Sequence, residues 1–366
     1  MQEIKKRRIV IASVLKPVDD TRMFEKFGHT LSTVHEVHVV GFGPASADKI
    51  SSMQHPIGIF PRMSLSRLLA PWRILNIIWK LKPDLLIVCT HELLCQGALA
   101  KLTLKCRLWY DVQENYARNI RSTNSFPPIL RSFVAVYVRI KERLLAPAIE
   151  QYLIAEESYA DEMPYLRSRA VVISNKVCRK DFVIRNRHTV PSQPPLKLIF
   201  TGTLSDLTGV FVAIDIAQAL HAVHPVILSI IGFCPQESMR DKLIQRCRDL
   251  DFVTLKTGDV PMAHTEIVTS IAMADVGIIS YPRNRATWDC VPTKLYEYLA
   301  SRLPLLLINN PKWTTLAASY HAAVVFDPTA FQAGKVLGAL LTGRFYTADP
   351  QDVYWESEAE LLLQLV

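Results

Sequence analysis

The residues best suited to chemistry lie between Ser280 and Arg302, where an irregular loop leads into an expected helix. We expect this helix to begin at Pro292, because proline is favoured at the first helical position. Lys294 and Glu297 are three residues apart and therefore share one face of the helix. A helix start offers free N–H groups and a positive dipole end, which together suit a diphosphate. The ammonium could meet phosphate oxygens, and the carboxylate could accept hydrogen bonds from ribose or sugar hydroxyls.

A simpler explanation stays open for Lys294 and Glu297, because a solvated ion pair on an ordinary helix has the same spacing. Further polar residues surround them and would serve a charged ligand. These are Thr293 at the helix start and Arg283, Arg285 and Asp289 in the preceding loop.

Polar residues also follow expected strands in the first half of the chain, where they could orient a sugar or an acceptor. Each has a structural alternative: the first two pairs could cap the next helix, and the third could be loop carboxylates. The pairs are Asp20 with Arg22, His91 with Glu92, and Asp111 with Glu114.

The second half opens with a loop from Thr201 to Gly209, in which Gly202 and Gly209 provide turns. Its spacing is not that of a Walker phosphate loop, and Thr208 stands before the second glycine. The first strand lacks G-x-G-x-x-G, which argues against a dinucleotide oxidoreductase. No clustered histidine motif suggests a metal.

Short apolar runs that alternate with segments of helical period must position these residues. Such runs indicate parallel strands buried on both faces, and their repetition predicts two doubly wound, Rossmann-like α/β domains with a ligand cleft between them. The expected strands are Arg8–Val14, Glu36–Gly41, Leu85–Cys89, Leu108–Val112, Gln151–Ala155, Ala170–Ser174, Lys197–Thr201, Ile227–Gly232, Phe252–Lys256, Val276–Ser280, Leu305–Ile308 and Ala323–Phe326.

The segment at residues 181–196 is polar and rich in proline, so it is interpreted as a linker. We expect one domain at 1–180 and a second domain at 197–345.

A family resemblance sharpens these expectations. The run Pro292-Thr-Lys-Leu-Tyr-Glu-Tyr-Leu-Ala-Ser-Arg-Leu-Pro resembles the P-x-K-x-x-E-Y-x-A-x-x-x-P segment of family 4 retaining glycosyltransferases of the GT-B superfamily. Asp289 and Glu297 match that family's pair of acidic residues eight positions apart, with aspartate in the first place. The resemblance implies that Glu297 binds the donor ribose, Asp289 contacts the transferred sugar, and Lys294 binds the donor phosphate.

Weaker motifs agree with it in order. Asp19-Asp-Thr-Arg resembles the family's D-x-R loop, and Pro83-Asp-Leu-Leu-Ile-Val-Cys-Thr-His its P-D-x-x-x-x-H element. Tyr110-Asp-Val-Gln-Glu is similar to Y-D-x-H-E, with Gln113 where histidine is usual. The loop that ends at Gly209 is similar to the family's glycine loop, with Thr208 in place of lysine. Arg283, Arg285 or Lys294 must then carry the phosphate-binding charge. The family also implies metal-independent catalysis and a C-terminal helix, here 346–366, that returns to the first domain.

Charge is distributed unevenly along the 366 residues. Residues 1–180 contain 27 Lys and Arg against 16 Asp and Glu, whereas 181–366 contain 15 against 18, within an overall net charge of +8. A basic first half favours an anionic membrane surface or a phosphorylated acceptor, and no nucleic-acid motif accompanies the charge. One amphipathic, arginine-rich segment at Ile129–Leu145 could rest on a bilayer or simply cover the sheet.

No apolar run is long enough to span a membrane, and the seven scattered cysteines suggest a reducing compartment. The basic N-terminus is interpreted as leading into a first strand and not as a signal peptide. We expect a cytoplasmic protein, with peripheral attachment to the inner membrane face as an option.

The leading hypothesis is transfer of a sugar from a nucleoside diphosphate sugar to an acceptor hydroxyl, with retention, in polysaccharide or glycolipid synthesis. The nucleotide sugar is a co-substrate and no cofactor is expected. Asp20, His91, Glu114 and Asp289 would orient sugar and acceptor, while Lys294 and the loop arginines stabilise the leaving diphosphate. Two alternatives remain: a nucleotide-sugar 2-epimerase on the same scaffold, and a non-catalytic scaffold that binds nucleotide sugar or a membrane.

Overall fold

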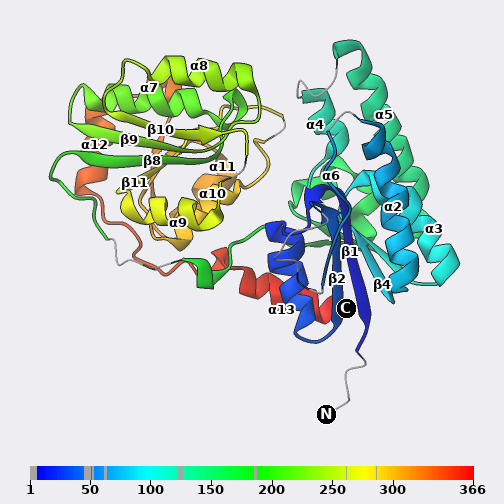
Figure 1. The fold of residues 1–366 in the computed structure, drawn as a ribbon. Coiled ribbons are helices and arrows are strands. Elements are labelled where there is room, and N and C mark those ends of the chain that lie inside the picture. The colour runs from blue at the N-terminus through cyan, green and yellow to red at the C-terminus, as the bar shows by residue number, and fades with distance from the viewer. Residues whose placement is uncertain are drawn as a thin grey trace. The chain divides into compact units, whose positions relative to one another are not determined.

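The structure, a computed structural model, describes residues 6–44, 51, 53–61, 64–122, 127–182, 184, 188–260, 262–285 and 287–366. It divides into two compact units (Figure 1). The first comprises Met1–Asn175 with Trp355–Val366, and the second comprises Lys176–Tyr354. Residues 181–196 therefore belong to the second unit by their contacts.

The first unit is built on a seven-stranded sheet in the order β3-β2-β1-β4-β5-β6-β7, in which every neighbouring pair is parallel. Its strands are β1 (Arg8–Pro17), β2 (Glu36–Phe42), β3 (Gln54–Pro56), β4 (Leu85–Val88), β5 (Arg107–Val112), β6 (Gln151–Ile154) and β7 (Ala170–Val172). Its helices are the π-helical η1 (Thr21–Gly28), α1 (His29–Ser32), α2 (Leu65–Leu81), η2 (His91–Leu93), α3 (Leu94–Leu104), α4 (Tyr116–Ser122), α5 (Pro128–Leu145), η3 (Ala146–Ala148), α6 (Ser158–Glu162), η4 (Pro164–Arg169) and α13 (Trp355–Leu365).

The second unit has a six-stranded parallel sheet in the order β10-β9-β8-β11-β12-β13. Its strands are β8 (Leu196–Thr203), β9 (Val226–Phe233), β10 (Val253–Gly258), β11 (Val276–Ile279), β12 (Leu305–Ile308) and β13 (Ala323–Phe326). Its helices are η5 (Arg179–Asp181), η6 (Asp206–Thr208), α7 (Val210–His221), α8 (Glu237–Cys247), α9 (His264–Met273), α10 (Thr293–Ala300), α11 (Pro311–Ala318), η7 (Pro328–Ala330), α12 (Ala333–Thr342) and η8 (Gln351–Val353).

The expected fold class of two Rossmann-like domains is confirmed by these parallel sheets, and all twelve expected strands form. One further strand, β3, was not expected, because its Gln-His-Pro sequence carries no apolar run. In the second unit, α7 and α8 cover one face of the sheet and α9 and α10 the other (Figure 1). The chain order reverses between β8 and β11, so the carboxyl ends of these two strands form a topological switch point.

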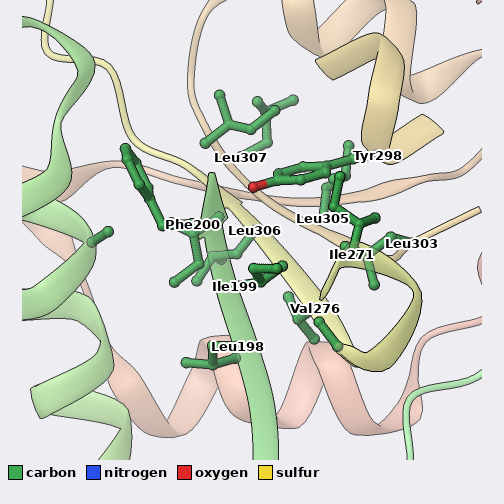
Figure 2. Packing of buried hydrophobic residues seen from close by; sticks show 14 of the residues in the cluster. Leu198, Ile199, Phe200, Ile271, Val276, Tyr298, Leu303, Leu305, Leu306 and Leu307 are labelled. Carbon is green, nitrogen blue, oxygen red and sulfur yellow. The ribbon is translucent and has the colours of Figure 1, made fainter. Parts of the chain in front are cut away.

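The second core joins side chains from β8, β11 and β12 to the buried side of α10. Leu198, Ile199, Leu306 and Val276 are fully or almost fully buried, and Tyr298 of α10 packs over them (Figure 2). The Tyr298 hydroxyl lies 3.1 Å from both the backbone nitrogen and the Oγ1 of Thr201. Full burial of a leucine, isoleucine or valine side chain, as in this core, contributes roughly 1.5–3 kcal/mol to the stability of the fold. This packing fixes α10 against the end of β8.

Helix α13 returns the chain to the first unit. The Trp355 ring stacks on Phe27 with ring centroids 5.6 Å apart, and its Nε1 donates to Thr30 Oγ1 at 3.0 Å. Glu358 accepts from the backbone nitrogen of Ser174 at 3.1 Å. The first core therefore includes a segment from the far end of the sequence.

Candidate functional site

Lys294 lies in the first turn of α10 and points under the carboxyl end of β8. The helix begins at Thr293 and not at Pro292: Pro292 has φ −68° and ψ 138°, so it is the residue that precedes the first turn. Either position tolerates proline because neither needs its N–H for the helix. The Pro292 side chain makes no capping hydrogen bond to this helix start.

The Lys294 ammonium is enclosed by aromatic rings. Its Nζ lies 3.6 Å from the centroid of Phe200 and 5.0 Å from that of Tyr281, and the residue is only 4% exposed. Burial lowers the pKa of Lys294 to about 7, although the negative charge of Glu297 opposes the shift. The ring faces compensate part of the lost hydration, since aromatic faces attract cations.

The Lys294 Nζ forms no hydrogen bond with any residue that the structure describes. A buried ammonium without such a partner is costly, because desolvation is not repaid by hydrogen bonds. Its three donors therefore have capacity for an anion that enters the site.

Two glycines shape the backbone beside this lysine. Gly202 has φ +97°, and a side chain on Gly232 of β9 would begin 1.8 Å from the Gly202 carbonyl oxygen. Gly209 has φ +78°, and a side chain there would begin 1.9 Å from the carbonyl oxygen of Ser280. Ser280 Oγ also donates to the Gly209 carbonyl at 2.8 Å. The positive φ favours glycine at both turns, and at Gly209 the close approach of Ser280 excludes a side chain as well.

Glu297 lies one turn further along α10 and is 8% exposed. Its Oε1 lies 3.4 Å from Nε2 of His264, the first residue of α9. Glu297 thus places its carboxylate near the Lys294 ammonium, and the His264 imidazole of α9 approaches that carboxylate. Sequence reasoning paired Glu297 with Lys294 only and did not identify His264.

Thr208 stands where the family usually has lysine, and its side chain forms hydrogen bonds within its own loop. Its hydroxyl donates to the Thr203 carbonyl at 2.8 Å, and its Oγ1 accepts from the Ser205 nitrogen at 3.1 Å. Together with Ser205 it forms a reciprocal capping box around η6. The positive charge at this edge must therefore come from other residues.

The loop that precedes α10 presents Arg283, Arg285 and Asp289 as exposed side chains. Arg283 lies over the Trp288 ring, with 5.9 Å between its Cζ and the ring centroid. Asn284 braces the loop by donating to the Pro282 carbonyl and to Thr287 Oγ1. The backbone carbonyl of Asp289 accepts from Lys312 at 3.3 Å, while its carboxylate remains on the surface.

Trp313 and Asn310 attach this loop to α11. Trp313 Nε1 donates to the Cys290 carbonyl at 2.8 Å, and Asn310 Nδ2 donates to the Trp288 carbonyl at 2.8 Å. The second unit thus brings Gly202, Lys294 and Glu297 together, sets Thr293 at the helix start beside them, and leaves the two arginines and Asp289 on the loop.

In the first unit, Asp20 follows β1 and caps η1. Its Oδ1 accepts from the backbone nitrogens of Arg22 at 3.0 Å and Met23 at 2.9 Å. Arg22 forms a buried ion pair with Asp111, with 2.8 Å between Nη2 and Oδ1. Gln113, which stands where the family usually has histidine, donates to Asp111 Oδ2 at 2.8 Å. Asp20 therefore acts as a helix cap, one of the alternatives considered from the sequence.

His91 follows β4 and is held between Lys141 and Tyr116. Its Nδ1 lies 3.0 Å from Lys141 Nζ, and its ring meets Tyr116 edge-on at 4.8 Å. Burial and the charges of Lys141 and Arg67 lower the pKa of His91 to about 3, so it is neutral near pH 7. A neutral imidazole beside an ammonium accepts that hydrogen bond through Nδ1, which leaves Nε2 protonated as a donor.

Glu114 lies in the loop after β5, and its Oε2 accepts from Asn119 at 3.1 Å. Asp20, His91 and Glu114 all follow strands of one parallel sheet, so they share its carboxyl edge. Among the residues that the structure describes, no group of His, Cys, Asp or Glu side chains has the arrangement of a metal site.

The sequence did not identify the two aromatic residues whose rings contact the Lys294 ammonium, Phe200 and Tyr281. Phe200 lies within β8 and Tyr281 lies just after β11, and a buried aromatic residue at either place is indistinguishable in sequence from ordinary core. The only available signal was their position directly before or after the switch point of the sheet.

Comparison with solved structures identifies proteins of similar fold. Sucrose-phosphate synthase from Thermosynechococcus elongatus superposes with a TM-score of 0.70 at 14% identity, over 98% of both chains. HepE of Anabaena in complex with UDP-glucose gives 0.66 at 14% identity, over 98% of this chain and 99% of that one. The UDP-GlcNAc 2-epimerase of Methanocaldococcus jannaschii gives 0.58 at 10% identity, over 98% and 99%.

No family model and no curated protein matches the sequence. Similarity at this level of identity establishes architecture, and the neighbours are GT-B proteins with Rossmann-like domains. The chain therefore has the GT-B fold.

Proposed function

We propose that this protein transfers a sugar from a nucleoside diphosphate sugar to an acceptor hydroxyl, and that the second unit binds the donor. One observation carries the proposal: the buried Lys294 ammonium has no hydrogen-bond partner among the described residues and lies at the switch point of the sheet. Open parallel sheets bind ligands at such points. A diphosphate is the anion that a lysine, a helix start and a glycine turn accommodate together.

In this proposal, Lys294 donates to the diphosphate and α10 directs the N–H groups of its first turn, which begins at Thr293, toward it. Gly202 and Gly209 let the backbone approach the phosphates closely. Glu297 accepts hydrogen bonds from the ribose hydroxyls, and Arg283 and Arg285 add positive charge from the loop. As the glycosidic bond breaks, negative charge grows on the leaving diphosphate, and a fixed buried cation stabilises that charge most.

Asp289 would contact the transferred sugar, while Asp20, His91 and Glu114 would orient sugar and acceptor from the first unit. The sequence resemblance supports these roles, together with retention of configuration, catalysis without a metal, and no cofactor beyond the nucleotide sugar itself. It also supports an acceptor in polysaccharide or glycolipid synthesis. The solved complex of HepE with UDP-glucose, which shares the fold, makes a uridine diphosphate sugar the first donor to test.

The test is direct binding of a panel of nucleotide sugars by calorimetry, with the Lys294→Met variant and the matched control Lys335→Met. Methionine keeps most of the apolar part of the side chain inside the aromatic site but removes the ammonium, and Lys335 is an exposed residue of α12 in the same unit. Loss of a charge-assisted contact of about 1.5–3 kcal/mol predicts roughly 10- to 100-fold weaker donor binding for Lys294→Met alone. Equal affinity of both variants and the parent would exclude the assignment.

A second candidate function is nucleotide-sugar binding without transfer. It is favoured by the existing partners of the first-unit residues, since Asp20 caps η1 and Glu114 binds Asn119. Incubating the protein with its best donor and a membrane extract separates the candidates. Transfer requires a glycosylated product, a 2-epimerase yields an isomerised nucleotide sugar without any acceptor, and a scaffold returns the donor unchanged.

A further inference from the structure

Among the residues that the structure describes, most of the exposed large apolar side chains lie on two helices of the first unit, α2 and α5. On α5 these side chains recur every three or four residues and so form a stripe along one helix face. The stripe consists of Ile129, Phe133, Tyr137, Ile140 and Leu144, and Phe133 is 71% exposed.

Helix α2 carries a second stripe of the same kind. Its members are Leu65, Leu68, Leu69, Trp72 and Trp79, and Trp72 is 52% exposed. Two aromatic indoles on such a stripe are notable, because tryptophan suits surfaces where one side is apolar and the other is wet. A monomeric protein rarely leaves a large contiguous apolar patch uncovered.

The topology places both helices on one face of the sheet. The connections β3–α2–β4, β4–α3–β5 and β5–α5–β6 all advance in the same direction across the sheet, so right-handed crossovers set their helices side by side. Helix α3 packs against both α2 and α5, and Trp79 Nε1 of α2 donates to Thr103 Oγ1 of α3 at 3.1 Å. Figure 1 shows α2, α3 and α5 on the same side of the unit.

The charge on this face has a single sign. Helices α2, α3, α4 and α5 contain one acidic residue, Glu142, which is 3% exposed and accepts hydrogen bonds from Tyr110 and Tyr165. Exposed basic side chains flank the stripes, among them Arg73 and Lys80 on α2 and Arg143 on α5. The face is therefore apolar along its centre and positive at its margins.

We propose that the α2–α5 face docks on an anionic lipid bilayer. An apolar stripe with tryptophan and basic flanks is the pattern of a helix that lies in the membrane interface, and each basic residue near anionic lipid adds to the attraction. A second copy of this chain is a poorer occupant, because a twofold interface would bring the same positive margins against each other. The proposal does not depend on the transferase activity.

Docking in this way has a geometric consequence for the first unit. Helix α2 begins at the carboxyl edge of the sheet, where His91 and Glu114 also lie, and α5 passes this edge near Lys141 in its C-terminal part. Arg67 of α2 pairs with Glu92, and Lys141 of α5 bonds the adjacent His91, so the two helices converge on η2. A bilayer on this face would lie beside that edge, where a lipid-linked substrate could reach it.

The experiment is flotation of the full-length protein with vesicles of phosphatidylcholine, alone or mixed with phosphatidylglycerol at about two to one. We expect binding to the anionic vesicles that is at least about tenfold stronger than to the neutral ones, and that weakens as salt rises from about 0.05 to 0.5 M. Phe133→Ser combined with Ile140→Ser should weaken binding about tenfold or more. Arg73→Glu combined with Arg143→Glu should remove the preference for anionic lipid.

Matched controls come from α8 and from the residues that directly follow α7 and α8 in the second unit, which also expose apolar and basic side chains. Val223→Ser with Ile244→Ser, and Lys242→Glu with Arg248→Glu, should leave vesicle binding unchanged. Absence of vesicle binding at low salt, or equal losses in these controls, would overturn the proposal. So would a concentration-dependent dimer, seen by size exclusion, that Phe133→Ser with Ile140→Ser abolishes.

Discussion

The ammonium nitrogen of Lys294 lies 3.6 Å from the centre of the Phe200 ring, and no described residue shares a hydrogen bond with it. The two residues belong to different elements, α10 and β8, that the buried Tyr298 holds together. An ammonium enclosed by aromatic rings is partly compensated for lost water by their faces but keeps its capacity to donate. The relationship places a buried cation at the end of β8 whose donors are not used by any described residue.

Donor affinity should therefore depend on pH through Lys294. Its pKa is lowered to about 7 by burial, and a bound diphosphate favours the charged form, so binding must raise the pKa and take up a proton above pH 7. We expect roughly tenfold weaker binding of a nucleotide sugar at about pH 8.5 than at about pH 6.5. Calorimetry in buffers of different ionisation enthalpy measures the proton uptake directly. Lys294→Met should bind weakly at both pH values, and a pH dependence that persists in this variant would assign the effect to another group.

The same lysine should make the unliganded protein more stable at alkaline pH. In the unfolded chain its pKa is near 10.4, whereas in the folded chain it is about 7, so the unfolded state binds more protons between these values. The free energy of unfolding should thus rise as pH increases from about 7 toward 10. Lys294→Met should lack this rise and be more stable than the parent near pH 7, by on the order of a few kcal/mol. Urea unfolding of the parent and of Lys294→Met at about pH 7 and about pH 10 measures these free energies. A methionine variant that is less stable than the parent near pH 7 would contradict the prediction.

The strands, the two-domain fold and the shared helix face of Lys294 and Glu297 could be predicted because each follows from local patterns. Continuous apolar runs identify buried parallel strands, and helical spacing relates residues three apart. The enclosure of Lys294 could not be predicted, because Phe200 and Tyr281 reach it through the packing of α10 against β8 and β11. The same limit applies to His264, whose approach to Glu297 depends on how α9 lies against α10.

The sequence also could not predict the exact start of a helix or the hydrogen-bond partners of single side chains. Pro292 precedes α10 instead of opening it, since its ψ of 138° is extended and proline suits either position. Asp20 could be a cap or a substrate ligand from its sequence, and only the backbone geometry shows that it accepts from two N–H groups of η1. Its role toward a substrate stays a prediction.

Gly209 should be intolerant of alanine. Its φ of +78° disfavours any side chain, and a Cβ there would begin 1.9 Å from the Ser280 carbonyl oxygen, so the loop and the end of β11 would have to separate. We expect Gly209→Ala to lower the free energy of unfolding by about 1–3 kcal/mol and to weaken donor binding. Gly338→Ala in the middle of α12 is the matched control, because nothing lies within 4 Å of its Cβ position. That change should stabilise by about 0.5–1 kcal/mol, and equal effects of the two substitutions in urea unfolding would refute the steric argument.

The ion pair between Arg22 and Asp111 should be the polar contact whose disruption destabilises the first unit most. Both side chains are at most 3% exposed, and Asp111 also accepts from Gln113, so removing its charge leaves the buried guanidinium without its ion-pair partner. We expect Asp111→Asn to lower the free energy of unfolding by roughly 3–5 kcal/mol. The exposed pair Arg8–Glu36, with about 40% of each side chain accessible, provides the comparison. Glu36→Gln should change stability by less than about 1 kcal/mol, because water and salt screen that pair. Urea unfolding measures both variants, and similar small losses would mean that Arg22 finds another partner or is reached by water once Asp111 is neutral.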